Sequence, residues 1–414
     1  MRMLITNIKE LLQVRPIAPT KVAGTQMQEL PVLADAWLYM EDGIIKDFGT
    51  DLGDLEHYSK KAQTLIDATG RMVLPAFCDS HTHLVYAGSR EKEYVDKIKG
   101  LSYEEIAKRG GGILNSAKRL NQATETELFD AAWQRLEEIM HLGTGAVEIK
   151  SGYGLTTDSE LKILRVIRQL KEKSPLNIKA TFLGAHAVPA EYKGNQEEYV
   201  NLVINEMIPM VAGEGLADYI DVFCDRGFFT PIDTERILMA GIKFGLKPKI
   251  HANELDFSGG IQVGVKYSAL SVDHLECTGD EEIQALLNSE TMPTLLPGAA
   301  LFLGLEYPPA RKMIEAGLPI ALASDYNPGS SPSGNMQLIM SLGSIVLRML
   351  PQEVINAVTI NGAYAMGLEE QLGSITIGKK ANLILTKPIS SYAFLPYAFG
   401  SNKVEKIIIN GIVQ

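Results

Sequence analysis

The strongest constraint on the fold is an alternation of short strand-like runs with longer amphipathic stretches, which begins near Arg71. Stretches rich in Leu, Ile, Ala, Glu and Lys, such as Ser159–Lys173 and Glu197–Glu214, separate most of the runs. A β-then-α unit repeated eight times predicts an α/β fold, a (β/α)8 TIM-like barrel. An open doubly wound sheet has the same periodicity, although no Gly-rich dinucleotide loop follows the first run. The eight runs are Met72–Asp79, Ala146–Lys150, Ile178–Ala185, Tyr219–Cys224, Lys247–Ala252, Ala269–His274, Met292–Leu296 and Pro319–Ser324.

Both ends of the chain have a different residue pattern, which predicts β-structure. In the N-terminal part, short apolar pieces are broken by Gly and Pro, and Glu41-Asp42-Gly43 predicts a hairpin turn. The C-terminal part has the same pattern of short apolar pieces, and neither segment has enough apolar residues for a core of its own. We therefore expect a barrel domain, residues 72–372, inserted into a small β-sandwich domain built from residues 1–71 and 373–414.

Charge and cysteine content narrow the classes of partner. The chain of 414 residues carries 39 Lys and Arg against 50 Asp and Glu, and the net charge of −11 disfavours nucleic acid and anionic membranes. Cys78, Cys224 and Cys277 form no CxxC pair and are expected to be reduced thiols. The N-terminus lacks an apolar signal core and no apolar run is long enough to cross a membrane, so we expect a cytoplasmic protein.

Histidines cluster at the ends of the predicted strands. His81 and His83 follow the first run, and residues two apart in an extended segment point to the same side. His251, His274 and Asp325 close the fifth, sixth and eighth runs. Because the carboxyl ends of barrel strands meet at one mouth, these groups are expected to share one metal ion, and neutral imidazole suits zinc or iron.

These positions resemble the metal-dependent amidohydrolase superfamily, and longer motifs are similar to the imidazolonepropionase family within it. The motifs, in chain order, are DSHTHLVYAGSREKEY with GGGI after it, EIKSGYGL, FLGAHAVP, HANE followed by GG, SVDHLE and SDYNPGSSP. The resemblance implies metal-assisted hydrolysis of the cyclic amide of 4-imidazolone-5-propanoate to N-formimino-L-glutamate, in histidine degradation. It also implies a homodimer and one zinc or iron ion per subunit, with His81, His83, His251 and Asp325 as the metal ligands.

A single ion also suits this sequence when it is compared with superfamily members that bind two metals. Members with two metals usually need a carboxylated lysine at the fourth strand, and the fourth run ends in Val-Phe-Cys-Asp-Arg. Lys150 ends the second run instead, and we interpret it as structural support for the site.

Residue chemistry assigns expected roles around the ion. Asp325 would also accept the first proton, His274 would orient the attacking water or steady the oxyanion, and Glu254 would protonate the leaving nitrogen. An arginine suits the propanoate tail of this small anionic heterocyclic substrate. The resemblance implies substrate contacts at Arg90, Tyr153, His186, Glu254, Asn327, Gly329 and Ser330, and Tyr103 and the Gly110–Gly112 loop are weaker candidates.

Two other functions stay open at this point. A single-metal deaminase of a nucleobase or related heterocycle would share the ligands, His274 and Glu254, but would not need an arginine for a carboxylate. A catalytically inactive scaffold barrel would typically have lost ligands, whereas all four are present here.

Overall fold

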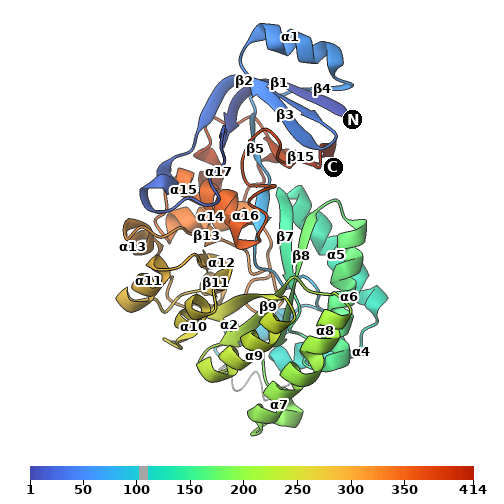
Figure 1. Cartoon of the computed structure of the whole chain (residues 1–414), viewed down its shortest axis with the longest axis vertical. Coiled ribbons are helices and arrows are strands. Elements are labelled where there is room, and N and C mark those ends of the chain that lie inside the picture. The colour runs from blue at the N-terminus through green and yellow to red at the C-terminus, as the bar shows by residue number, and fades with distance from the viewer. Residues whose placement is uncertain (102–110) are drawn as a thin grey trace.

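The computed structural model describes residues 1–101 and 111–414, and its larger part is a parallel barrel (Figure 1). Eight strands follow one another in chain order around it, and each pairs in parallel with the next. The prediction of a (β/α)8 barrel is confirmed. The strands are β6 (Phe77–Asp79), β7 (Thr144–Lys150), β8 (Asn177–Ala185), β9 (Tyr219–Cys224), β10 (Lys247–Ala252), β11 (Ser271–His274), β12 (Met292–Leu295) and β13 (Ala321–Leu322).

The predicted first strand is in fact two strands that belong to different sheets. Met72–Pro75 forms β5 and pairs with the terminal strands β1 and β14, whereas Phe77–Asp79 forms β6 of the barrel. The change occurs at Ala76, whose N–H donates to Asn382 O, while the N–H of Phe77 donates to Gly143 O. A continuous apolar run does not reveal this switch, because both halves are buried.

Backbone hydrogen bonds beyond the strand ends bring the first and last barrel strands together. Thr82 forms an isolated parallel bridge with Tyr326, and the N–H of His83 donates to Tyr326 O. The N–H of Asp325 donates to His81 O at 3.0 Å. This closure sets three of the predicted metal ligands side by side.

Helices cover the outside of the barrel (Figure 1). Some of these helices begin at recognisable capping residues. Thr124 forms a capping box at the start of α5 (Glu125–His141), and Thr230 forms one at the start of α9 (Pro231–Lys243), where Pro231 occupies the first turn. The helices that follow the barrel strands or lie between them include α2 (Glu91–Ile98), α4 (Ile113–Gln122), α5 (Glu125–His141), α6 (Thr157–Lys173), α7 (Gln196–Leu202), α8 (Ile208–Gly213), α9 (Pro231–Lys243), α10 (Gly260–Lys266), α11 (Asp280–Leu287), α12 (Pro297–Leu303), α13 (Ala310–Glu315), α14 (Met336–Ile345), α15 (Pro351–Val358) and α16 (Ile360–Ala365). Between α7 and α8, Val203–Met207 is a π-helical turn.

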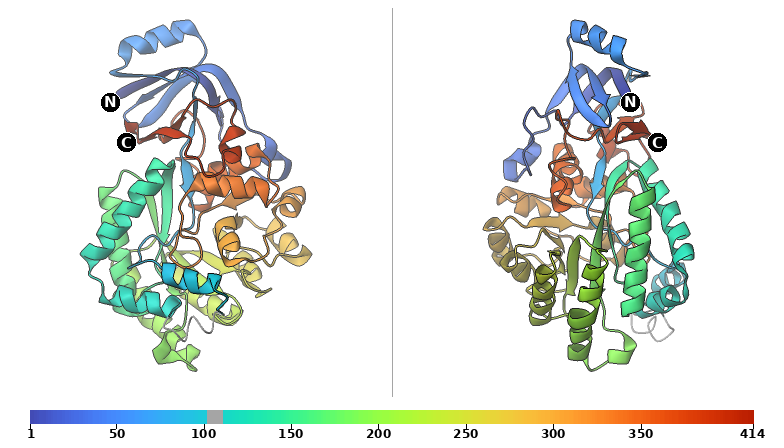
Figure 2. Two further views of the ribbon diagram at one scale, coloured as in Figure 1. Left: turned by 180° about the vertical axis from the view of Figure 1, so that it is seen from behind. Right: turned by 45° about the vertical axis from the view of Figure 1, so that its right-hand side comes forward.

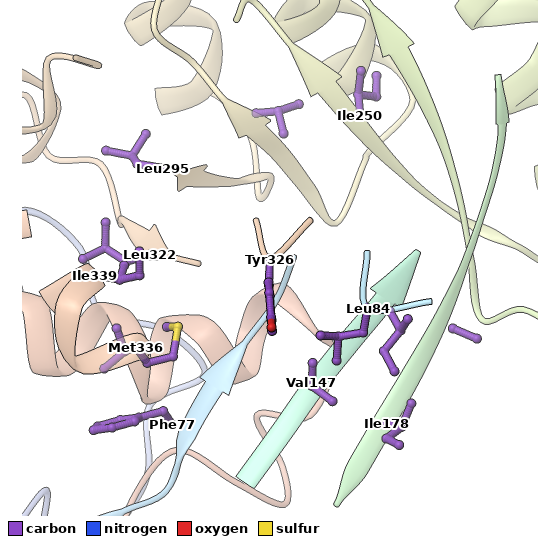
Figure 3. Packing of buried hydrophobic residues seen from close by; sticks show 14 of the residues in the cluster. Phe77, Leu84, Val147, Ile178, Ile250, Leu295, Leu322, Tyr326, Met336 and Ile339 are labelled. Carbon is purple, nitrogen blue, oxygen red and sulfur yellow. The ribbon is translucent and has the colours of Figure 1, made fainter. Parts of the chain in front are cut away.

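Apolar side chains from strands and helices fill the space between the barrel wall and its cover. Figure 3 shows Val147, Ile178 and Ile250 from the strands, and Met336 and Ile339 from α14, in this layer. All five are buried. This continuous core supports the strand ends that carry the polar site.

Both ends of the chain contribute to the second sheet (Figures 1 and 2). The sheet branches at β1, which pairs with β2, β4 and β5, and the C-terminal strand β14 continues it by pairing antiparallel with β5. Its strands are β1 (Arg2–Leu12), β2 (Val32–Glu41), β3 (Ile44–Gly49), β4 (Thr64–Asp67), β5 (Met72–Pro75), β14 (Leu383–Thr386), β15 (Val404–Ile409) and β16 (Ile412–Val413). The remaining helices are α1 (Leu52–Lys61) and α17 (Phe394–Tyr397).

The hairpin predicted at residues 41–43 is present, with Asp42 and Gly43 both at positive φ between β2 and β3. The division into domains at residues 71, 72, 372 and 373 stays a prediction. Within the described residues, no helix is long and apolar enough to cross a membrane.

The terminal sheet packs directly on the amino end of β7. A Cβ on Gly143 would lie 2.9 Å from Ile384 Cδ1, and one on Gly145 would lie 3.3 Å from Ile409 Cδ1 and 2.5 Å from Ala76 Cβ. These glycines leave room for side chains of β14 and β15 to reach the base of the barrel.

Candidate active site

The predicted metal ligands meet in one buried cluster. His81 and His83 follow β6, His251 lies on β10, and Asp325 follows β13. His81 Nε2 lies 3.4 Å and His83 Nε2 lies 3.7 Å from Asp325 Oδ1. The ring centres of His81 and His251 are 4.4 Å apart.

This cluster fits a metal ion. His81 offers a ligand atom to two sets of three, with His83 and Asp325 or with His251 and His274, and within each set the atoms lie within 4.8 Å of one another. The Nε2 atoms of His81 and His251 are buried and have no hydrogen-bond partner among the described residues. Buried nitrogens without a partner are costly, and an ion would satisfy them. Burial lowers the pKa of His81 and His83 well below the usual value, so both rings are neutral, as metal ligands must be.

Two carboxylates lie behind the histidines. His81 Nδ1 donates to Asp273 Oδ2 at 2.6 Å, and His251 Nδ1 lies 3.0 Å from Asp221 Oδ2. A proton held at Nδ1 leaves the lone pair of Nε2 free to face an ion. The bond to Asp273 therefore orients the ring of His81, whereas Asp221 accepts from the backbone N–H of His251 at 3.0 Å and lies beside its ring. The sequence motifs did not assign a role to either carboxylate.

Beneath the ligands, the barrel interior is charged. Lys150 Nζ donates to Glu148 Oε1 at 2.6 Å and to Asp221 Oδ2 at 2.8 Å. Lys249 Nζ pairs with the other oxygen of Glu148, and all these side chains are fully buried. Burial alone would lower the pKa of Lys150, but the charges of Asp221, Glu148 and Asp273 raise it, so Lys150 is charged. These buried ion pairs support the interpretation of Lys150 as structural support for the site.

The charged interior is visible in the sequence as charged residues at alternate strand positions, which the family motifs do not mark. Glu148 and Lys150 alternate with apolar residues on β7, Lys249 and His251 do so on β10, and Asp273 stands two residues after Ser271 on β11. Residues two apart share one face of a strand. Charged residues at alternate positions of otherwise apolar barrel strands therefore indicate a polar barrel interior.

The backbone is unusual where strands end at the site. His274 has φ 87°, Leu275 has φ 70° and Asp325 has φ 52°. Non-glycine residues rarely adopt these values, and such conformations concentrate at functional sites. His274 is buried beside His251, with a ring-centre distance of 5.3 Å.

A tight loop holds Asp325 in place. Asn327 Nδ2 donates to Asp325 O and to Ser330 Oγ, both at 2.7 Å, and its Oδ1 accepts from the N–H groups of Gly329 and Ser330. Ser330 Oγ in turn donates to Asp325 Oδ2 at 3.2 Å. The amide of Asn327 thus organises the loop, and a direct contact of Asn327 with substrate stays a prediction.

Glu254 and His274 form the second polar edge of the site. Glu254 Oε2 lies 3.8 Å from His274 Nδ1, and Glu276 Oε2 lies 3.9 Å from the same nitrogen. Burial raises the pKa of Glu254 to about 8, helped by the charges of Asp325 and Asp225. Glu254 is therefore mostly protonated at neutral pH and can donate a proton.

The substrate contacts that the resemblance implies all line one cavity of about 820 Å³ that opens beside the cluster, whereas Gly111 and Gly112 of the weaker candidate loop do not line it. The implied contacts are Arg90, Tyr153, His186, Glu254, Asn327, Gly329 and Ser330. His186 Nδ1 donates to Gly152 O at 3.0 Å, which leaves its Nε2 as an acceptor. Gly152, at φ 110°, makes this approach possible, because a Cβ there would lie 2.8 Å from the ring. Tyr103 and Gly110 lie outside the described residues.

Comparison with known sequences identifies close relatives over nearly the full length. The model of the Amidohydrolase family matches residues 243–413. The imidazolonepropionase of Flavobacterium johnsoniae is 59% identical over 409 residues, which are 99% of this chain and 98% of the relative. That of Christiangramia forsetii is 57% identical over 412 residues, 99% of each chain.

Solved structures share the fold at low sequence identity. The guanine deaminase of E. coli superposes with a TM-score of 0.74 at 13% identity, covering all of this chain and 98% of the other. An adenosine deaminase of Xanthomonas campestris with bound zinc has a TM-score of 0.68 at 15% identity, covering 99% and 92%. At these identities the likeness concerns the fold alone.

Proposed function

The chain belongs to the imidazolonepropionase family of the amidohydrolases, and from this premise we propose that it hydrolyses the cyclic amide of 4-imidazolone-5-propanoate to N-formimino-L-glutamate, a step of histidine degradation. One observation carries the proposal. A single cavity combines the histidine–aspartate cluster, a carboxyl group that holds a proton at neutral pH, and an arginine suited to a carboxylate.

We assign His81, His83, His251 and Asp325 as the ligands of one zinc or iron ion per subunit. When bound, such an ion would supply Lewis acidity and lower the pKa of water from 15.7 toward ~7. The partnerless Nε2 atoms of His81 and His251 support this assignment. The nitrogen and oxygen donors suit either metal.

The protein's own groups move the protons. Asp325 accepts a proton from the water that attacks the carbonyl carbon of the ring. Glu254, protonated at neutral pH, gives a proton to the ring nitrogen as the C–N bond breaks. His274, held beside Glu254, orients the water or steadies the oxygen that becomes negative.

The cavity walls bind the substrate. Arg90 receives the propanoate tail, and Tyr153 and His186 hydrogen-bond the polar ring. The buried, neutral ring of His186, whose pKa is lowered to about 3 by burial, offers an acceptor at Nε2 for a ring N–H. Gly329 and Ser330 line the wall near Arg90.

Absorbance and metal content measured on one sample test the proposal. Purified protein should remove the ultraviolet absorbance of imidazolonepropanoate and contain close to one zinc or iron ion per subunit. Aminated purine and pyrimidine bases, offered in parallel, should release no ammonia. Ammonia release without opening of the imidazolone would establish a deaminase instead, and protein free of both metals and inert on every substrate would favour a scaffold barrel.

The proposal also includes the oligomeric state of the protein and its location in the cell. We propose a homodimer in the cytoplasm. Two of the three cysteines, Cys78 and Cys224, are buried free thiols, which suits a reducing compartment. Light scattering of the purified protein tests the dimer.

A further inference from the structure

The guanidinium of Arg90 is already held by a carboxylate of the protein. Arg90 Nε donates to Glu93 Oε2 at 2.7 Å, and Arg90 Nη2 lies 2.6 Å from the same oxygen. Both side chains are largely shielded, with 18% and 16% of their surfaces exposed. Such a charge-assisted pair restricts the rotamers of a long side chain at the cavity wall.

This pairing uses only one edge of the guanidinium. A guanidinium presents two edges that can each bind a carboxylate with two N–H groups, one formed by Nε with Nη2 and the other by Nη1 with Nη2. Glu93 takes the first edge. Among the described residues, no acceptor is bonded to Nη1, so the second edge stays open for a ligand.

Gly329 leaves the space that Nη1 occupies. A Cβ on Gly329 would lie 2.2 Å from Arg90 Nη1 and 3.2 Å from its Cζ. The φ of Gly329 is not in the left-handed region, so space rather than backbone conformation requires glycine here. The open edge of Arg90 therefore lies against the loop that follows the ligand Asp325, on the wall of the cavity.

Glu93 is itself fixed from two sides. It stands in the first turn of α2, of which Arg90 is the N-cap, and its Oε2 also accepts from the N–H of Gly112 at 3.0 Å. Gly112 is the N-cap of α4. One carboxylate oxygen thus ties Arg90 to the starts of two helices.

We propose that Glu93 is a positioning residue for substrate recognition: it holds Arg90 by the Nε edge, so that the Nη1–Nη2 edge faces the substrate carboxylate beside Gly329. The inference rests on the proposed function, since it concerns how the propanoate tail is bound. Glu93 touches no reacting atom, and its effect is confined to the carboxylate end of the substrate.

Steady-state kinetics with two substrates test this role. We expect Glu93→Ala to raise KM for imidazolonepropanoate about tenfold with kcat nearly unchanged, because an Arg90 that is no longer held would lose about one hydrogen bond to the charged propanoate. Glu93→Gln, which keeps an acceptor oxygen, should show a smaller rise. The propanamide analogue of the substrate, which lacks the negative charge, should show the same KM with wild type and both variants.

Two further variants make the test specific. Arg90→Ala alone should raise KM for the carboxylate substrate, and adding Glu93→Ala to it should raise KM no further, because Glu93 acts through Arg90. Gly329→Ala should raise KM in the same substrate-dependent way by displacing Nη1. Asp130→Asn is the matched control, because Asp130 is an exposed carboxylate of α5 with no ion pair among the described residues.

Several results would overturn the inference. An unchanged or lower KM in Glu93→Ala would show that Glu93 does not hold Arg90 productively or that it competes with the substrate. Equal losses on the carboxylate and carboxamide substrates, or additive effects of the two substitutions, would show a general structural role. Failure of the wild-type enzyme to open the ring would refute the proposed function instead, so the two failures are distinct.

Discussion

At the scale of single residues, the site is defined by groups whose ordinary behaviour is changed by burial. Asp325 combines a positive φ, a bond from Ser330 and a place between two histidines. Glu254 is almost withdrawn from solvent and keeps its proton near neutrality. These two carboxyl groups have the same chemistry in water, and their different surroundings support the separate roles that we propose for them.

Replacing Asp325 by Asn tests its role directly. We expect turnover to fall by at least ~10²-fold, because the amide cannot accept a proton as a carboxylate does. The fold should persist, since Asn can still accept the bond from Ser330. Ring-opening rates and circular dichroism measure the two effects, and an Asn variant with wild-type turnover would refute the assigned role.

The raised pKa of Glu254 predicts a decline in rate on the alkaline side of the pH–rate profile. With a raised pKa the acid form dominates below about pH 8 and is lost above it, so kcat should decline as pH rises through that value. Glu254→Gln should lower kcat by ~10²–10⁴-fold, and its residual rate should lack this decline. A wild-type profile that stays flat to pH 9 would argue against a proton donated by Glu254.

At the scale of the strand, the inward face of β10 has two kinds of position. His251 faces the site, and Lys249, two residues earlier, belongs to the charged interior. Lys150 joins three carboxylates, two of which lie against ligand histidines. The charged interior therefore supports the histidines that we propose as metal ligands.

Lys150→Met should be strongly destabilising. Removing one partner of a buried ion pair leaves uncompensated carboxylates and typically costs about 3–5 kcal/mol of unfolding free energy. Chelator-treated protein in denaturant titrations gives this value without any contribution of bound metal. Lys171→Met, on the exposed face of α6, is the control and should change stability by less than about 1 kcal/mol. Equal stability of the two variants would refute the role given to Lys150.

The sequence predicts the strands and the polar residues that meet at their ends better than it predicts the side chains that support these residues. His251, His274 and Asp325 stand out because polar residues end apolar runs. Asp221 and Asp273 lie inside such runs, and only the three-dimensional register shows which histidine each one meets. Likewise, the break at Ala76 depends on the hydrogen bond from its N–H to Asn382 O, and no local pattern contains a residue so far along the chain.

At the scale of the whole molecule, the two sheets share one boundary. Ile384 and Ile409, from the C-terminal strands, fill the space left by Gly143 and Gly145 at the base of the barrel. Ile384, Ile409 and Phe77 belong to the same buried cluster as the barrel core. We therefore expect the terminal sheet and the barrel to unfold together.

Truncating one side chain at this boundary tests the coupling. Ile409→Ala should lower the free energy of unfolding by about 2–5 kcal/mol, as for other buried large-to-small changes. Calorimetry should still show a single transition, displaced to lower temperature. Ile412→Ala, at a position 54% exposed, is the control and should shift it little. Two separate transitions in the Ile409 variant would mean that the parts are independent.

The pairing of β5 with β14 also has a consequence for biosynthesis. Leu74 lies opposite Ile384, so the edge of β5 has no partner until residues 383–386 have left the ribosome. At translation rates of about 5–20 residues per second, this exposed edge persists for tens of seconds. Unpaired strand edges promote aggregation, so we expect the nascent chain to be most prone to aggregation during that interval.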